Sequence, residues 1–213
     1  MNYSLLISLL LFVSFSGYTQ KHFLGFGNAA FTDWAVATAE AEPSEYTGIV
    51  QSTYGFSFYT ASGQFKYNVY EFNSELALSI GASPAFGFFI WNGDELASTE
   101  GFGVLRVPLF VQLDIGNLST FESTRSSGFG IGAGYQYENY LGLMSGGGAF
   151  TRIAYRYFNR NNKAKEISLK IGFPHRMSHR TVETFDANNN LVTFESGYKV
   201  TSFQLTFTQY FNY

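Results

Sequence analysis

The sequence predicts an all-β fold, namely an eight-stranded antiparallel up-and-down transmembrane β-barrel. Its last sixteen residues, 198–213, place Phe203, Leu205 and Phe207 at every second position, with polar residues between them. A period of two indicates a strand with one apolar and one polar face. The chain also combines 14% charged residues with 19% aromatic residues and 22 glycines. This composition is typical of a barrel whose exterior is not entirely in water.

A secretory signal peptide, residues 1–20, is predicted ahead of a single barrel domain, residues 21–213. The apolar run Leu5–Phe15 is followed by small and polar residues, as in the core and cleavage regions of such a peptide, although no Lys or Arg precedes it. The run is too short to cross a bilayer as a helix, which takes about 20 apolar residues. Because the chain holds no cysteine, we expect neither a lipid-anchored cysteine nor disulfide bonds.

Eight strands are expected from the alternating segments and from the turn signals between them. Seven of them are His22–Phe31, Tyr46–Tyr59, Phe102–Ile115, Gly128–Glu138, Ala149–Phe158, Ala164–Phe173 and Tyr198–Tyr213. The remaining one, third in chain order, is a bent strand that joins Gln64–Phe72 with Glu75–Ala82 and continues irregularly through Pro84 to Trp91. A barrel strand needs about 9–11 residues to span a membrane, so the chain is long enough for eight. The last strand is expected to pair with the first, because this closure removes the exposed sheet edges.

The connections between these strands carry further predictions. Thr32–Glu45 is expected to be a loop with a short helix over Ala35–Ala41, and Ser62-Gly63 is expected to be a tight turn. Pro174–Gly197 is expected to be a long loop or a small hairpin. A ten-strand barrel is the alternative, if the bent strand divides in two and another strand lies within Thr181–Glu195.

The polar face of these strands is predicted to point into the barrel. In Phe102–Ile115, Leu105 and Val107 flank Arg106, and the polar face of Gly128–Glu138 carries four glycines. Such small residues leave room inside a narrow barrel for long side chains from other strands. A soluble barrel has the opposite polarity, with large apolar residues inside and charges outside. The pattern therefore predicts an exterior of Leu, Ile, Val and aromatic residues that contacts lipid.

Charged residues on the inward face form the first candidate site, a polar network in the lumen. They are Arg106, Asp114, Arg152, Arg156, Glu166 and Lys170, with Glu71 and Glu75 as further candidates. An eight-stranded barrel is only just wide enough for its own side chains, and buried charges are very costly unless they are paired. We therefore expect ion pairs that fill the lumen. The alternative is a narrow polar conduit or ligand site in which Arg152 and Arg156 contact an anion.

Four stretches resemble the small outer-membrane β-barrel proteins that are common in Bacteroidota, a family largely without assigned activity. They are Leu76–Gly87 (LALSIGASPAFG), Val107–Gly116 (VPLFVQLDIG), Phe129–Tyr137 (FGIGAGYQY) and the aromatic C-terminus. Phe211 and Tyr213 are similar to the signal that the barrel-assembly machinery reads in the last strand, while Gln209 stands where an apolar residue is usual. The resemblance implies an outer-membrane location with lipid and lipopolysaccharide as surroundings, and it specifies architecture rather than function.

The segment His175–Arg180 is the second candidate site. Its histidines, His175 and His179, lie four residues apart with Ser178 between them. Such residues could form a metal pair or part of a Ser–His site, and some eight-stranded outer-membrane barrels are lipid A-modifying enzymes. Histidines at this spacing meet on a helix, however, whereas this segment follows a strand and Pro174, and no third ligand or general base is evident. We therefore expect a basic loop near anionic lipopolysaccharide, with no catalytic residue, metal or cofactor.

Acidic residues in two connections form the third candidate site. They are Asp33, Glu40, Glu42 and Glu45 in the first connection, and Asp94, Glu95 and Glu100 in the second. An up-and-down topology places both connections at the same rim, where they could bind a divalent cation or a partner. Their spacing matches no dense calcium loop, so we expect solvated carboxylates.

The function predicted from the sequence is that of an integral outer-membrane protein with a plugged polar interior and a structural or interaction role through its outer loops. A small-solute pore or transport accessory is the first alternative, and a lipid-modifying enzyme is the second. The net charge of −3 offers no basic face for nucleic acid. The expected partners are outer-membrane lipid, lipopolysaccharide and the barrel-assembly machinery; the sequence indicates no particular protein partner.

Overall fold

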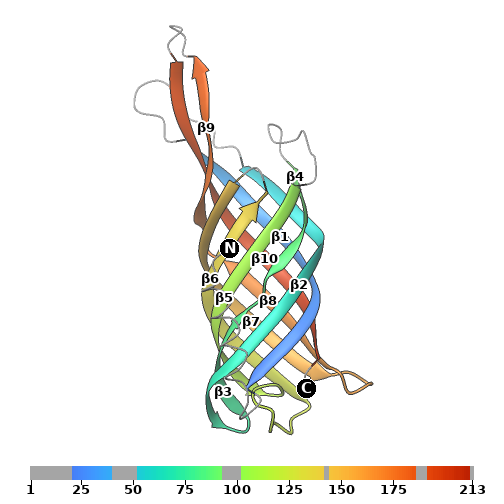
Figure 1. The fold of residues 1–213 in the computed structure, drawn as a ribbon. Helices are drawn as coiled ribbons and strands as arrows, with labels where there is room; N and C mark the ends of the chain where they lie inside the picture. The colour runs from blue at the N-terminus through green and yellow to red at the C-terminus, as the bar shows by residue number, and fades with distance from the viewer. Residues whose placement is uncertain (1–20, 40–51, 93–101, 142–143, 186–190, 212–213) are drawn as a thin grey trace, which may run out of the picture.

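The computed structural model describes residues 21–39, 52–92, 102–141, 144–185 and 191–211. The predicted signal peptide, residues 1–20, lies outside these residues. The described chain is built from antiparallel strands, and Figure 1 shows them wound into a tilted barrel. No helix within the described ranges is long and apolar enough to cross a membrane.

Ten strands make up the described sheet, and each pairs with its neighbours in antiparallel orientation. Their bounds are β1 (His22–Ala39), β2 (Ser52–Asn73), β3 (Leu76–Ala82), β4 (Ala85–Asn92), β5 (Phe102–Gly116), β6 (Ser127–Tyr140), β7 (Met144–Phe158), β8 (Ala164–Gly172), β9 (His175–Phe185) and β10 (Leu191–Tyr210).

These strands occupy eight positions in a closed ring. Strands β3 and β4 follow one another in the position between β2 and β5, and β8 and β9 share the position between β7 and β10. The ring closes because β1 pairs with β2 on one side and with β10 on the other. The sequence-based prediction of an up-and-down barrel closed by the first and last strands is therefore confirmed. The described sheet also has the ten strands of the alternative count: Gln64–Phe72 lies in β2 and is separate from β3, and part of Thr181–Glu195 lies in β9.

Strand β1 is longer than the sequence suggested. The expected loop from Thr32 and the expected helix from Ala35 are wrong as far as Ala39, because β1 continues to that residue while paired with β10. Alanine favours helices, but pairing with β2 as far as Val36 and with β10 as far as Ala39 satisfies backbone groups of β1 and overrides that local preference. The remainder of the expected loop, residues 40–45, lies outside the described ranges.

Strand β2 runs without interruption through Ser62-Gly63, so the tight turn expected there is wrong. The turn comes later, where the side chain of Asn73 accepts a hydrogen bond of 2.8 Å from the backbone N–H of Glu75. The residues on either side of this turn form a hairpin of β2 with β3 rather than one bent strand. The local glycine signal failed because Gly63 pairs with Phe26 on β1 within the continuous sheet.

Strands β9 and β10 form a hairpin that stands beyond the ring in Figure 1. Their pairing runs from Leu191 opposite Phe185 to Val200 opposite His175. Of the two possibilities for Pro174–Gly197, the hairpin is confirmed and the irregular long loop is wrong. We call this end of the barrel the hairpin end. The opposite end, where β1 begins and β10 ends, is the terminal end.

The two faces of the sheet differ sharply in polarity. Large apolar and aromatic side chains are exposed on the outside, among them Phe26, Leu109, Ile131, Ile153 and Phe207. The alternate positions point inward and are buried, and they carry most of the polar and charged side chains. The inverted polarity expected from the sequence is thus the arrangement that the structure shows.

Candidate functional site: the charged lumen

Nine charged side chains point inward from the described strands, and all nine are buried. They comprise four carboxylates and five cations: Asp33, Asp114, Glu138, Glu166, Lys66, Arg106, Arg152, Arg156 and Lys170. Charges removed from water are tolerated when they are paired and hydrogen-bonded. Strand β5 shows how they are distributed, because it carries Asp114 near the terminal end and Arg106 near the hairpin end. Each of these two residues is the centre of a cluster.

Asp114 is the centre of the terminal-side cluster. Its carboxylate forms ion pairs with Lys66 at 3.1 Å and with Arg156 at 2.6 Å. It also accepts hydrogen bonds from the hydroxyl of Ser79 and from the side-chain amide of Gln112. These donors come from four strands, so one carboxylate links β2, β3, β5 and β7 across the interior. Such a hub fixes the relative position of the strands that meet there.

Glu166 extends the same cluster towards β7 and β10. It forms an ion pair with Arg152 and lies 3.9 Å from Nε of Arg156. The hydroxyl of Tyr210 donates a hydrogen bond of 2.8 Å to the second carboxylate oxygen of Glu166. Arg152 also donates to the side-chain oxygen of Gln112, which joins the two carboxylates into one network.

Arg106 is the centre of the hairpin-side cluster. It forms an ion pair with Asp33, and its Nε lies 3.5 Å from Glu138. The hydroxyl of Tyr140 accepts a hydrogen bond of 2.9 Å from Arg106 and donates one to Asp33. On the other side, Glu138 lies 3.7 Å from Nε2 of His175. Residues from β1, β5, β6 and β9 are therefore connected at this level.

Inward phenylalanines lie beneath four of the five cations. A cation over an aromatic face is stabilised by the electrons of the ring, and the ring also fills space that would otherwise be void. The pairs, with the distance from the charged group to the ring centroid, are Lys66 over Phe23 at 4.3 Å, Arg106 over Phe31 at 3.8 Å, Arg152 over Phe110 at 4.4 Å and Lys170 over Phe150 at 5.2 Å.

The β5–β6 loop, residues 117–126, folds against the terminal end of the lumen. Leu118 is fully buried with Phe23 and Tyr210, and its backbone carbonyl accepts hydrogen bonds from Lys66 and Arg156. The φ angle of Leu118 is +59°, a left-handed conformation that is rare for a residue other than Gly, Asn or Asp. Phe121 stacks on Phe23 with 4.4 Å between the ring centroids. The loop thus packs into the interior at this end.

An apolar layer lies at the hairpin end of the lumen. Phe31 stacks on Phe89 at 5.4 Å, and Phe89 meets Tyr140 edge-on at 4.9 Å. Ala35, Val104, Met177 and Val200 complete this buried cluster. The two charge clusters are therefore enclosed between packed apolar groups at both ends.

Glycines on the inward face provide the space for these long side chains. A Cβ atom on Gly130 would collide with the side-chain amide of Gln112 and would lie 2.9 Å from the carboxylate of Asp114. A Cβ atom on Gly148 would collide with the ring of His175. The size of these residues, rather than their backbone freedom, explains their placement.

The structure separates the six predicted lumen residues into three groups. Arg106 belongs to the hairpin-side cluster, while Asp114, Arg152, Arg156 and Glu166 belong to the terminal-side cluster. Lys170 is 4% exposed, and its Nζ has no hydrogen-bond partner among the described residues. Of the two further candidates, Glu71 is exposed and Glu75 accepts hydrogen bonds from Ser123 and Thr124 at the terminal rim.

Three charged members of the network were not found from the sequence. Lys66 and Glu138 continue the inward alternation of Gln64 and Gln136, and this period-two pattern could have identified both. Asp33 was assigned to the acidic first loop, which is wrong because it is buried against Arg106. The other acidic residues of that candidate site, Glu40, Glu42, Glu45, Asp94, Glu95 and Glu100, lie outside the described residues.

The segment His175–Arg180 is part of strand β9 rather than a loop. In a strand, residues four apart are separated by about 13 Å along the chain, which is too far for His175 and His179 to share one metal ion. The ring of His175 contacts Glu138 and the backbone carbonyl of Phe173, so it forms part of the interior. The side chains of Ser178 and His179 are outside the described set.

The predicted assembly signal lies at the end of β10. Phe211 is 66% exposed, and its backbone N–H donates a hydrogen bond of 2.9 Å to the carbonyl of Leu24 on β1. Tyr213 is outside the described residues. The recognition of this segment by the barrel-assembly machinery stays a prediction.

No family model matches the chain, and no curated protein matches it. Among solved structures, the outer membrane protein OprG from Pseudomonas aeruginosa has a TM-score of 0.47 and 11% identity, over 93% of this chain and 99% of that one. The outer membrane protein AlkL in lipid bilayers has a TM-score of 0.47 and 16% identity, over 92% of both chains. The P. putida toluene transporter TodX has a TM-score of 0.23 and 6% identity, over 94% of this chain and 92% of that one. We therefore interpret the lumen and the surface of this barrel from their own contacts.

Proposed function

We propose that the chain is an integral outer-membrane protein whose lumen is plugged and whose role is structural or interactive through the loops at its hairpin end. The observation that carries this proposal is the filling of the interior. Two networks of buried ion pairs lie between an apolar layer at one end and the β5–β6 loop at the other. A solute would have to break several of these ion pairs in order to pass, which makes passage very unfavourable.

The exterior supports the membrane location. Side chains such as Leu109 (58% exposed), Ile131 (61%) and Phe88 (72%) would face water in a soluble protein, and an outer face with this many exposed apolar side chains indicates contact with lipid. The closed ring supports it further, because each described strand pairs with a neighbour on both sides, so the described sheet has no open edge in the ring that would have to enter the hydrocarbon. The Bacteroidota-type family rests on the sequence resemblance alone.

The lengths of the connections support an orientation. At the terminal end, β2–β3 and β7–β8 are joined by short turns, and the β5–β6 loop packs into the lumen. At the opposite end, β1 stops at Ala39 and β2 starts at Ser52, β4 stops at Asn92 and β5 starts at Phe102, and the β9–β10 hairpin extends beyond the ring. Outer-membrane barrels have short periplasmic turns and longer external loops. The terminal end then faces the periplasm and the hairpin end faces outward, where lipopolysaccharide surrounds the barrel.

Ion conductance in a planar lipid bilayer tests the plugged lumen. Purified barrel whose SDS-gel migration changes on heating would be inserted alongside an open trimeric porin as positive control. We expect no conductance steps from this chain. Steps from the wild-type barrel would overturn the proposal. A barrel recovered only in the soluble periplasmic fraction, with no heat-dependent migration, would overturn the membrane location instead.

A small-solute pore or transport accessory is the second candidate function. It is favoured by buried polar atoms that have no hydrogen-bond partner in the described part of the chain, among them the side-chain amide of Gln64, Oε1 of Gln204 and Nζ of Lys170. Water or a polar solute is the usual partner for such atoms. If conductance is observed, substitution of Lys170 by Met should change its ion selectivity, because Lys170 is the cation without a hydrogen bond or ion pair to a described carboxylate.

A further inference from the structure

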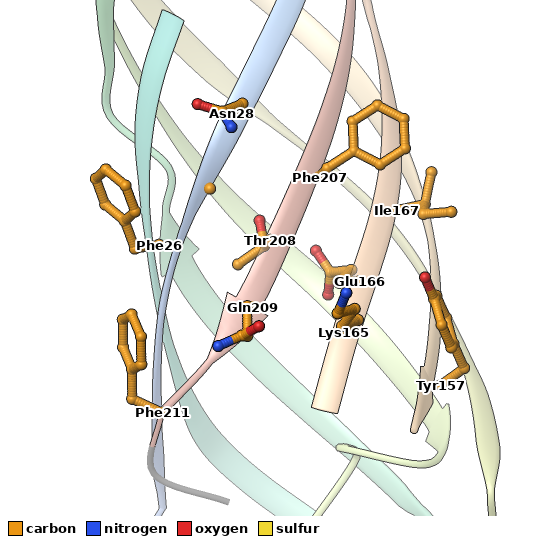
Figure 2. Close-up of a pocket in the computed structure, with 11 residues that line it drawn as sticks. Phe26, Asn28, Tyr157, Lys165, Glu166, Ile167, Phe207, Thr208, Gln209 and Phe211 are labelled. Atoms are coloured by element: carbon orange, nitrogen blue, oxygen red, sulfur yellow. The ribbon is translucent and has the colours of Figure 1, made fainter. Parts of the chain in front are cut away.

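A hollow of about 360 Å³ lies on the outer face near the terminal end, across β1, β10, β8 and β7. Figure 2 shows Phe26 and Phe211 on one side of it and Ile167 and Tyr157 on the other, with Gln209 and Lys165 between them. Phe26 and Phe211 are more than half exposed, so the hollow opens towards the barrel's surroundings. The inward residues Glu166 and Thr208 line its floor, where Glu166 is already bound by Arg152 and Tyr210.

The strand register explains the chemistry of the hollow. One row of outward side chains crosses it as Phe26, Gln209, Lys165 and Tyr157, because each of these residues is directly opposite the next. The next outward row, towards the hairpin end, contains Asn28, Phe207, Ile167 and Tyr155 in the same manner. The row nearer the terminal rim therefore has a polar centre, and the row above it has an apolar centre.

The polar centre has no protein partner among the described residues. No ion pair or side-chain hydrogen bond joins Lys165 or Gln209 to another described residue. The ammonium group of Lys165 lies between Gln209 and Tyr157 in this row, and such a group at a lipid-facing surface needs an anion or water to satisfy it. Lys165 is the second residue of β8, beside the β7–β8 turn at the terminal rim. In a barrel that spans a bilayer, this rim lies near the headgroup phosphates, and the acyl chains extend from there towards the bilayer centre.

We propose that this hollow binds one glycerophospholipid of the leaflet at the terminal end. Its phosphate contacts Lys165 and the side-chain amide of Gln209, and one acyl chain lies over Phe207 and Ile167. The inference rests on the membrane location proposed above, and it goes beyond it by assigning a lipid site. It also gives a reason for Gln209, the position at which the last strand departs from the usual apolar pattern.

Lipid retention measured by native mass spectrometry tests the site. The folded full-length barrel would be purified in a neutral detergent and supplied with dioleoylphosphatidylglycerol. We expect one bound lipid, and we expect Lys165→Leu to lower its occupancy about fivefold, the effect of about one cationic contact near a membrane surface. Gln209→Leu should lower the occupancy too. Lys199→Leu is the matched control, because Lys199 is an exposed lysine of β10 towards the hairpin end, and it should not change the occupancy.

Two further probes define what is recognised. Dioleoylglycerol has the same chains without the phosphate and should bind poorly, and inorganic phosphate should not displace the lipid because it lacks the chains. Three results would overturn the proposal: equal occupancy in wild type and Lys165→Leu, equal loss in Lys199→Leu, or tight binding of dioleoylglycerol. A dimer peak that Phe207→Ala abolishes would also overturn it, because a second copy of the chain would then cover the hollow instead of a lipid. If Lys165→Leu does not fold, Lys165→Gln removes the same charge with a polar side chain. The heat-dependent migration of each variant shows separately whether the barrel itself is formed.

Discussion

The guanidinium group of Arg156 and the backbone carbonyl of Leu118 meet at 2.8 Å, and this contact ties the β5–β6 loop to the wall of the barrel. The same guanidinium reaches the carboxylate of Asp114 at 2.6 Å. One arginine thus connects the β5–β6 loop with the terminal-side cluster of charges around Asp114. Leu118 holds its left-handed conformation in this position because its side chain and its carbonyl are both fixed by buried partners.

Asp114→Asn should destabilise the barrel by roughly 3–5 kcal/mol, the usual cost of removing one partner from a buried ion pair. The substitution leaves Lys66 and Arg156 without their shared carboxylate. The free energy of unfolding in urea, measured in lipid vesicles, checks this value. Glu122→Gln is the control, because Glu122 is exposed and its charge is solvated; similar unfolding midpoints for the two variants would contradict the prediction.

Phe121→Ala should loosen the β5–β6 loop while leaving the ring intact. The substitution removes the stacking of Phe121 on Phe23, which contributes about 0.5–1.5 kcal/mol beyond the burial of area. The measurement is limited trypsin digestion followed by mass spectrometry of the fragments. Cleavage after Arg125, within the loop, should become faster, while cleavage after Arg160 in the β7–β8 turn should stay unchanged. Equal rates at Arg125 in wild type and variant would show that Phe121 does not anchor the loop.

Gly130→Val should impair folding, whereas Ala133→Val should be tolerated. Both positions lie on β6, but Gly130 faces the side chains of Gln112 and Asp114 while Ala133 is exposed on the outside. Overfilling a packed interior costs about 1–3 kcal/mol and more when a charge network is displaced. The fraction that shows heat-dependent migration on an SDS gel after refolding measures the difference. The in-and-out assignment would be wrong if Ala133→Val were the more damaging change.

Leu109→Arg should destabilise the membrane-inserted barrel by roughly 2–4 kcal/mol, the cost of a lipid-facing arginine near the middle of a bilayer. Leu109 is 58% exposed on the outer face of β5. Leu109→Phe keeps the surface apolar and should change the stability by less than about 1 kcal/mol. Unfolding titrations in vesicles of the two variants provide the comparison. An arginine that costs nothing would indicate that this face contacts water.

The period-two pattern was sufficient to predict which residues face inward, but not which of them would meet. Arg106 and Asp33 are separated by 73 positions in the sequence, and their contact depends on the stagger of strands around the whole ring. Alternation defines the two faces of each strand and leaves that stagger open. The same limit applies to Lys66, whose partner Asp114 comes from across the lumen.

Errors in the predicted elements arose where local signals competed with the ring. The alanines at positions 35, 37 and 39 suggested a helix, and Ser62-Gly63 suggested a turn. Ala35 and Ser62 instead pair with strands on both sides, Gly63 pairs with β1, and Ala37 and Ala39 pair with β10. Leu118 could not be identified as a central residue of the loop, because an isolated leucine after a strand has no pattern around it. The exterior, by contrast, depends on local alternation alone and was predicted correctly.

The pairing of β1 with β10 also determines when, during synthesis, the sheet can close. These two strands share fifteen register pairs, from Gly25 opposite Tyr210 to Ala39 opposite Ser196. The ribosome nevertheless synthesises β1 before the other described strands and β10 after them. One edge of β1 therefore stays unpaired until β10 has been synthesised. A chain cut short before β10 is an open sheet rather than a smaller barrel. The sheet closes only when β10 is present, so the earlier strands have to be kept from aggregating until β10 pairs with β1.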